Sequence, residues 1–259
     1  GFIGYPTVNV TIDNLSFDGV KTTLKQNAEG KNLIGVGAVI GRNAAVATLT
    51  NVNVKLTTGY FGSLNGTANE KIHGIGGVIG YAGAASNVTL KGVAVDVNGA
   101  TLAGWYGLGG LIGETLGTVT INKIAAVGDA PAKASSVTGL SEMEVTFLNT
   151  DAYDNDNKQG MTGYFIGSAD LTKTIIISDA ADVNPAFTVG GKANLAKAFN
   201  VSGSYMYTYS KGAQSLIGQS GFAAGSATIN GTSYEVHMTN ATTTPNNVLY
   251  KIGRASCRE

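Results

Sequence analysis

The chain has 259 residues, of which 13% are charged and 37 are glycine, and its formal net charge at pH 7 is zero. A typical globular chain carries about 25% charged residues and about 7% glycine, so this composition is typical of a β-rich protein with Thr, Ser and Asn at its polar positions. Without an excess of basic residues we expect no nucleic-acid partner, and no apolar run approaches the length that spans a bilayer.

The first predicted element is a strand from Val8 to Phe17. Val8, Val10 and Ile12 alternate there with polar residues, and such a period of two places alternate side chains on opposite faces of a sheet. The same alternation predicts strands over residues 48–56 and 88–97.

A five-residue glycine phrase recurs along the first half of the chain. Its closing glycines are 39 and then 33 residues apart, and a second, apolar phrase follows each copy. The copies of the glycine phrase are Gly37-Ala38-Val39-Ile40-Gly41, Gly76-Gly77-Val78-Ile79-Gly80 and Gly109-Gly110-Leu111-Ile112-Gly113. The second phrases begin at Leu49, Leu90 and Ile121, and an earlier copy at Ile12 stands without a glycine phrase. Repeats at this period predict stacked units that bury their apolar faces on one another.

Each repeat is long enough for three short strands, which in the second repeat would cover residues 75–81, 88–96 and 100–105. We therefore predict an all-β fold, a right-handed parallel β-helix or β-solenoid in which Leu49, Leu90 and Ile121 share one core, as do Val52, Val93 and Ile124. Antiparallel β-sandwich modules are the alternative, because Asn65-Gly66 and Asn230-Gly231 are hairpin turn signals.

Three segments follow from this pattern. Residues 1–130 hold the regular repeats, and residues 131–251 continue them irregularly, with residues 130–160 as the main excursion. Residues 252–259 contain the only cysteine and every arginine except Arg42, and they read as the translation of a short-read sequencing adapter. We expect the natural sequence to end at about Lys251 and the chain to be a piece of a longer protein.

Catalytic patterns are scarce. His73 and His237 belong to no zinc-ligand cluster and are expected at the surface or across strands. The aligned residues Asp18, Lys55 and Asp96 alternate in sign, which indicates a surface charge ladder and no acid–base pair. We predict no enzymatic activity and no catalytic residues, although Asp154, Asp156, Asp170 and Glu235 could meet in the irregular half.

One acidic loop is a candidate calcium site. Asp151, Asp154 and Asp156 alternate with other residues before Gly160, and oxygen ligands spaced along a loop suit Ca²⁺. A solvated polar loop is the favoured alternative, because Lys158 intrudes and no Glu closes the loop. No other cofactor is expected.

Pairs of aromatic residues lie beside glycines, at the predicted ends of strands. They could stack against carbohydrate through their apolar faces, although capping of the core is the favoured alternative. The pairs that bear on this question are Tyr60-Phe61, Trp105-Tyr106 and Tyr164-Phe165.

The glycine phrase resembles the GLUG repeat, and Gly109-Gly110-Leu111-Ile112-Gly113 is the best copy. The resemblance covers residues 30–130 well and residues 160–235 faintly. It departs where the family often has Cys or Ser, because Val52 and Val93 stand there. The resemblance implies a structural or adhesive module of a bacterial cell-surface or secreted protein, with glycans or host-cell proteins as partners. A polysaccharide-binding or polysaccharide-processing β-helix protein is the alternative.

Overall fold

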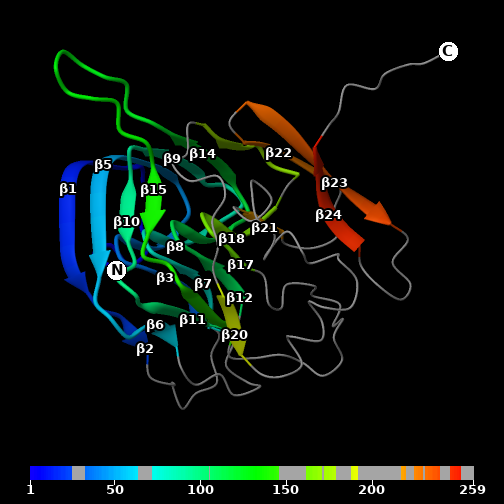
Figure 1. The fold of residues 1–259 in the computed structure, drawn as a ribbon, viewed down its shortest axis with the longest axis horizontal. Coiled ribbons are helices and arrows are strands. Elements are labelled where there is room, and N and C mark those ends of the chain that lie inside the picture. The colour runs from blue at the N-terminus through cyan, green and yellow to red at the C-terminus, as the bar shows by residue number, and fades with distance from the viewer. Residues whose placement is uncertain are drawn as a thin grey trace.

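The computed structural model describes residues 1–24, 33–63, 72–104, 106–145, 162–170, 172–178, 188–191, 217–219, 225–229, 231–239 and 246–251. Within these residues the structure contains strands and no helix, which confirms the all-β prediction (Figure 1). The loop that carries Asp151, Asp154 and Asp156 and the tail of residues 252–259 lie outside the described residues.

All the strands of the described residues belong to four curled sheets that are not closed, and most of the pairing is parallel. The largest sheet begins at β1 and β5 at one end of the molecule and finishes in an antiparallel hairpin at the other (Figure 1). Its strands are β1 (Val10–Val20), β5 (Val46–Leu56), β9 (Asn87–Lys91), β10 (Ala94–Asp96), β14 (Thr118–Asn122), β15 (Ser136–Thr138), β19 (Ile175–Ile177), β22 (Gly225–Ile229), β23 (Thr232–Thr239) and β24 (Asn246–Lys251).

The other three sheets are parallel throughout, and each takes one strand from each successive repeat. The second sheet contains β2 (Thr23–Leu24), β6 (Tyr60–Ser63), β11 (Thr101–Gly104), β16 (Glu142–Val145) and β20 (Thr188–Gly191). The third contains β3 (Leu33–Gly37), β7 (Ile72–Gly76), β12 (Tyr106–Gly109) and β17 (Thr162–Gly163). The fourth contains β4 (Ile40–Asn43), β8 (Ile79–Ala82), β13 (Ile112–Thr115), β18 (Ile166–Ala169) and β21 (Ile217–Gln219).

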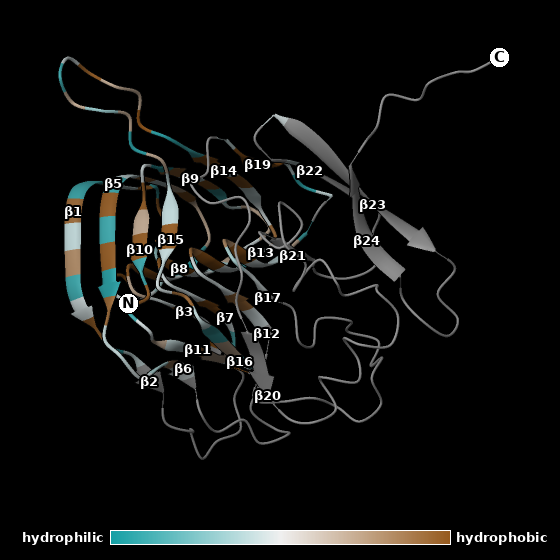
Figure 2. Ribbon diagram, in the orientation of Figure 1, coloured by the Kyte–Doolittle hydropathy of each residue, from teal (hydrophilic) through white to brown (hydrophobic). Residues whose placement is uncertain are grey.

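The repeat alignment predicts the register of the largest sheet correctly. Leu49 pairs with Leu90 and Leu90 with Ile121, and all three are fully buried. Alternating hydropathy along β1 and β5 appears as bands of colour in Figure 2. The period of two therefore sends one set of side chains into the core and leaves the other outside.

The prediction for the third copy of Val52 and Val93 is wrong. Val52 and Val93 are fully buried, but Ile124 is only half-buried and lies in an excursion that leaves the sheet after β14. The excursion returns at Ser135, whose hydroxyl accepts a hydrogen bond from the Val93 amide at 3.1 Å. It starts before the predicted boundary at residue 130, and Lys133 within it donates hydrogen bonds to the side chains of Asn51 and Asn53.

The glycine phrase is a bend between two sheets and not one continuous strand. Residues 75–81 divide into the end of β7 and the start of β8, so two strands stand where one was predicted. Glycine is required because the backbones nearly touch: a β-carbon on Gly76 would lie 2.5 Å from the amide nitrogen of Gly113 in the next repeat. Real β-carbons do not approach that closely, so a larger residue would push the two sheets apart.

The first repeat has a glycine phrase that the sequence analysis missed. Ile3 forms a parallel bridge with Ile40, and the Gly41 amide donates to the Ile3 carbonyl at 2.9 Å. Residues 1–4, Gly-Phe-Ile-Gly, thus take the place of residues 38–41. The spacing of eight residues from Gly4 to Ile12, equal to that from Gly41 to Leu49, is the signal that could have found it.

Candidate functional site

A row of polar and aromatic side chains follows the closing glycines of the repeats. Arg42 pairs with Tyr81, Tyr81 with Glu114, and Glu114 with Ser168 across β4, β8, β13 and β18. The guanidinium carbon of Arg42 lies 4.8 Å from the ring centre of Tyr5 and 5.4 Å from that of Tyr81. Within about 6 Å a cation is attracted to the face of an aromatic ring, so Arg42 is held between two rings.

Glu114 contacts a residue of another sheet. The His73 ring nitrogen Nδ1, on β7, lies 2.5 Å from the Glu114 carboxylate oxygen Oε2. The His73 side chain is 10% exposed and that of Glu114 is 1% exposed. A carboxylate can be buried to this degree only when it is hydrogen-bonded, so His73 satisfies a group that would otherwise destabilise the fold.

Tyr81 contacts the ring of His73, and the charge of Glu114 contributes to the shifted pKa of its phenol. Its ring meets that of His73 edge to face, with 6.1 Å between the ring centres. Burial, and then the charge of Glu114, raise the pKa of the Tyr81 phenol, while Arg42 opposes the shift. The phenol therefore stays neutral at higher pH than a tyrosine in solution would.

His73 was expected at the surface or across strands, and the structure shows the second: β7 is buried along its whole length, and His73 pairs with Ile34 on β3. Glu114 was not identified from the sequence, and its signal was its place after a closing glycine, in line with Arg42 and Tyr81. A His–Glu pair can transfer protons, but a general acid or base must reach a substrate atom. With Glu114 almost fully enclosed, the arrangement is suited to holding two sheets together.

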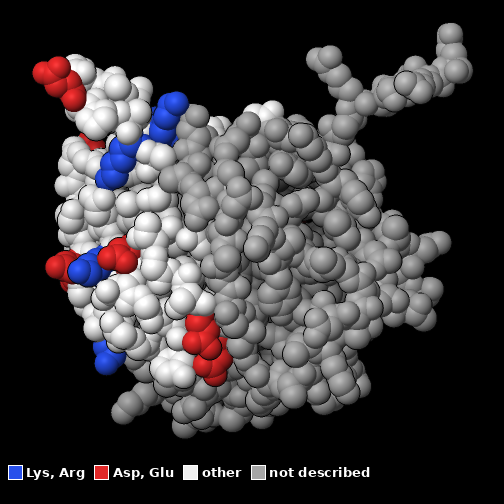
Figure 3. Space-filling view, in the orientation of Figure 1, with Lys and Arg blue, Asp and Glu red and all other residues white. Residues whose placement is uncertain are grey.

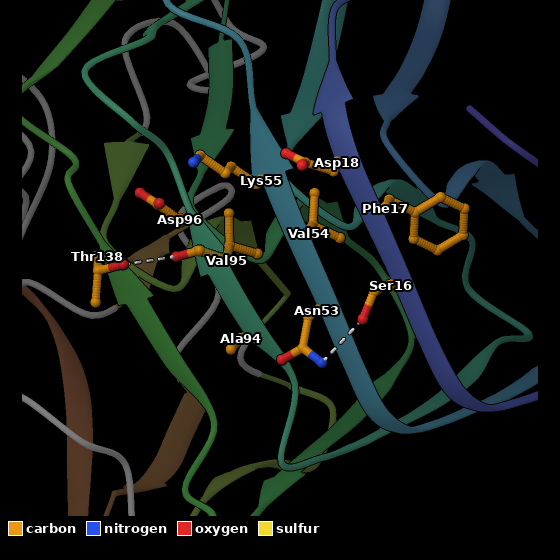
Figure 4. Close-up of a pocket in the computed structure, with 10 residues that line it drawn as sticks. All are labelled: Ser16, Phe17, Asp18, Asn53, Val54, Lys55, Ala94, Val95, Asp96 and Thr138. Atoms are coloured by element: carbon orange, nitrogen blue, oxygen red, sulfur yellow. Dashed lines mark hydrogen bonds between the residues drawn. The ribbon is translucent and has the colours of Figure 1, made fainter.

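The charge row on the outer face lies where the alignment predicts. Lys55 pairs with Asp96 across β5 and β10, and Lys55 lies between Asp18 and Asp96 in the close-up (Figure 4). These residues line an open groove of about 340 Å³, together with others that include Phe17 and Val54. On the face drawn in Figure 3, one of the basic patches lies between two acidic patches at the edge of the described surface. The groove therefore offers alternating charge and a little apolar surface.

Of the four carboxylates that could meet in the irregular half, Asp170 lies among the residues whose side chains the structure describes. Asp170 accepts hydrogen bonds from the amide and the hydroxyl of Thr172, at 3.0 and 2.6 Å, and so closes a turn. Glu235 lies on β23, while Asp154 and Asp156 fall outside the described residues. Among the residues that the structure describes, no group of three or more His, Cys, Asp or Glu could hold a metal ion.

Three of the four aromatic candidates whose side chains the structure describes belong to the core, and the side chains of Trp105 and Tyr106 lie outside this description. Phe61, Tyr164 and Phe165 are 1%, 5% and 0% exposed, and the Tyr164 hydroxyl donates to the Val137 carbonyl at 3.0 Å. Tyr60 is 39% exposed, and the charge of Glu144, followed by burial, raises its pKa. Of these side chains, only Tyr60 presents a ring that a sugar could stack on.

The comparisons with known proteins give no relative: no family model, no curated protein and no solved structure matches this chain. Among the described residues, no helix is long and apolar enough to cross a membrane.

Proposed function

We propose that this chain is a structural repeat module, a right-handed parallel β-solenoid of GLUG-like repeats that serves as a stalk or adhesive surface of a bacterial cell-surface or secreted protein. The observation that carries the proposal is the pairing of the repeats. Successive repeats add strands in parallel to each of four sheets, and residues in equivalent places face one another, as Leu49 and Leu90 do. In such an assembly each repeat is stabilised mainly by its neighbours.

Removal of one repeat tests this proposal. Deleting residues 42–80 joins Gly41 to Tyr81, which takes the place of Arg42 in the fourth sheet. A repeat module should keep its β-sheet circular dichroism and a cooperative, although lower, melting transition. A domain with one indivisible core should lose both.

A deletion one residue longer is the matched control. Removing residues 42–81 joins Gly41 to Ala82 and shifts the strand by one position, which reverses its two faces. We expect this variant to fold much less stably than the first. Equal stability of the two deletions, or unfolding of both, would contradict the solenoid proposal.

The adhesive part of the proposal concerns glycans or host-cell surface proteins as partners. The open groove at Lys55 and the exposed ring of Tyr60 are the features that support it. Binding of the purified chain to an array of glycans and to host-cell surfaces tests it, with Lys55→Glu and Tyr60→Ala as variants. Saturable binding that neither variant weakens would exclude these two features as the contact.

The second candidate, a polysaccharide-processing protein, is favoured by one observation, the buried pair of His73 and Glu114. We expect no turnover on a panel of polysaccharides, because so enclosed a carboxylate cannot reach a glycosidic oxygen. Turnover that disappears in Glu114→Gln, at a pH where this variant stays folded, would establish the enzyme and overturn the structural proposal.

A further inference from the structure

The groove beside Lys55 crosses several strands on the outer face of the largest sheet (Figure 4). Its lining residues come from the same level of neighbouring strands: residues 16–18 of β1, 53–55 of β5 and 94–96 of β10, with Thr138 of β15 at one end. The groove therefore belongs to a face of the sheet and not to an edge. A further strand beside β1 would lengthen it without covering it.

One wall of the groove carries charges that do not pair with one another. Asp18, Lys55 and Asp96 follow along this wall, and among the described residues no ion pair joins Lys55 to either carboxylate. The Asp96 carboxylate accepts a hydrogen bond from the Asn98 amide at 2.9 Å, which holds that side chain in place. Because these three charges do not neutralise one another by direct contact, each can pair with a group of opposite charge on a ligand.

The opposite wall is polar, and its side chains are held by one another. The Asn53 side-chain nitrogen donates to the Ser16 hydroxyl at 3.4 Å, and the Asn53 side-chain oxygen accepts from the Lys133 ammonium at 2.8 Å. Ala94 follows Asn53 on the next strand, and its short side chain leaves room above the sheet. Lys133 repels a basic group on this side, so a basic side chain in the groove turns toward the two carboxylates of the other wall.

The spacing of the two carboxylates selects the conformation of a polypeptide ligand. Asp18 and Asp96 stand two strands apart, and neighbouring strands are about 4.8 Å apart, so the carboxylates repeat at about 9.6 Å along the groove. A polyproline II helix brings every third side chain to the same face after about 9.3 Å. An extended strand repeats its faces after about 6.6 Å and an α-helix after about 5.4 Å, so neither matches this distance.

We propose that this groove binds a proline-rich segment of a host-cell surface protein, in the polyproline II conformation and with a lysine or arginine at every third position. Two basic side chains of the segment pair with Asp18 and Asp96. Lys55, between them, donates to a main-chain carbonyl, because this helix leaves its carbonyls without internal hydrogen bonds. Proline rings pack on the Ala94 methyl group and the aliphatic stem of Lys55. The inference rests on the adhesive part of the proposed function, because it names the class of partner for the same groove.

A fluorescein-labelled peptide of repeated Pro-Pro-Lys triplets is the probe, and its binding to the intact chain is followed by anisotropy. At about 0.15 M salt, where only nearby charges act on one another, we expect saturable binding with a Kd below about 1 mM. A peptide of the same composition with its lysines grouped together keeps the charge and loses the period of three. It should bind about 2- to 5-fold more weakly, and a peptide of Pro-Pro-Glu triplets should not bind.

Substitutions in the protein test the two carboxylates at constant shape. Asp18→Asn and Asp96→Asn should each weaken binding of the Pro-Pro-Lys peptide about 2- to 5-fold. Asparagine at position 96 keeps an oxygen that can accept from the Asn98 amide, so the turn beside the groove is preserved. Asp13→Asn is the matched control, because Asp13 is an exposed carboxylate on the same strand β1 but does not line the groove. It should leave the Kd unchanged.

Three results would overturn the proposal: no binding at about 1 mM peptide, equal affinity for the peptide with grouped lysines, and equal loss of affinity in Asp18→Asn and Asp13→Asn. A glucosamine oligosaccharide that binds where the peptide does not, and that Asp96→Asn weakens, would assign the groove to a cationic glycan instead. Failure of the adhesive role itself gives a different result, because the chain would then bind no host-cell surface at all. The deletion of residues 42–80 tests the repeat architecture separately.

Discussion

Replacing Gly113 by alanine should destabilise the fold by forcing two sheets apart. A β-carbon on Gly113 would lie 2.6 Å from the carbonyl oxygen of Gly80, and closer still to backbone atoms of Gly74 and Ile75. Non-bonded atoms are comfortable at about 3.5 Å, so the strands would have to separate by about 1 Å. All three contacts are with backbone, which no change of side-chain rotamer can relieve.

The size of the effect follows from two opposing contributions. Overpacking costs about 1–3 kcal/mol, whereas changing glycine to alanine restricts the unfolded chain and returns about 0.4–1 kcal/mol. We expect a net loss of about 1.3 kcal/mol in the free energy of unfolding. At about 2–4 °C per kcal/mol, the melting temperature should fall by about 3–5 °C.

Gly4→Ala is the matched control. Gly4 takes the same place in the first repeat, but a β-carbon there would meet no atom within 4 Å. Its free energy of unfolding, measured by urea titration, should therefore stay within about 0.5 kcal/mol of that of the parent chain. If Gly113→Ala and Gly4→Ala unfold at the same urea concentration, close backbone approach is not the reason for the glycine phrase.

Val93→Asp should cost about 3 kcal/mol or more in a urea titration, because it buries an unpaired charge, and half-buried Ile124→Asp should cost clearly less. Stability should fall above about pH 10, because the raised pKa of Tyr81 lets the folded chain keep a proton that the unfolded chain releases, and Tyr81→Phe should make this fall shallower. Millimolar Ca²⁺ should leave the melting temperature unchanged, and a rise that is lost in Asp154→Asn would instead assign an ion to the acidic loop.

The sequence predicts the parallel register wherever the repeat is regular. Leu49 and Leu90 could be matched because they follow the glycine phrases at similar distances, and equal places in a repeat become neighbouring places in space. The glycines of the phrase indicate a close backbone approach or a sharp corner, although residues 75–81 are predicted as one strand. The side-chain pattern does not show where within these residues the strand ends and the bend begins.

The candidate site was harder to find. His73 and Glu114 are 41 positions apart and belong to different sheets, so no local pattern links them. The repeat alignment shows that Glu114 stands where Tyr81 and Arg42 stand in earlier repeats. Nothing in it shows that a histidine on another sheet faces that row, because the distance between sheets depends on the intervening bends.

The failed prediction at Ile124 has a local cause. Asn14, Asn51 and Gly92 occupy the same place in three repeats, and all three have φ between 50° and 57°. Asparagine and glycine tolerate this left-handed conformation, whereas most residues lose about 1–2 kcal/mol in it. Lys123 stands at that place in the next repeat, does not adopt it, and begins the excursion.

Replacing residues 123–134 by one glycine should therefore close the excursion without disturbing the sheet. Asn122 would continue through the new glycine to Ser135, as Lys91 continues through Gly92 to Val93. The two hydrogen bonds of Lys133 would be lost, at about 0.5–1.5 kcal/mol each, but a long loop would no longer have to be ordered. We expect the free energy of unfolding to change by about 1 kcal/mol or less.

A valine in place of the inserted glycine is the informative comparison. Valine has the same number of backbone atoms but resists positive φ, so this version should be less stable than the glycine version by about 1–2 kcal/mol. If both shortened chains unfold at the same urea concentration, the conformation at this place does not decide where the strand continues. If both fail to fold, the excursion itself holds β14 and β15 in register, and the lost contacts of Lys133 become the reason.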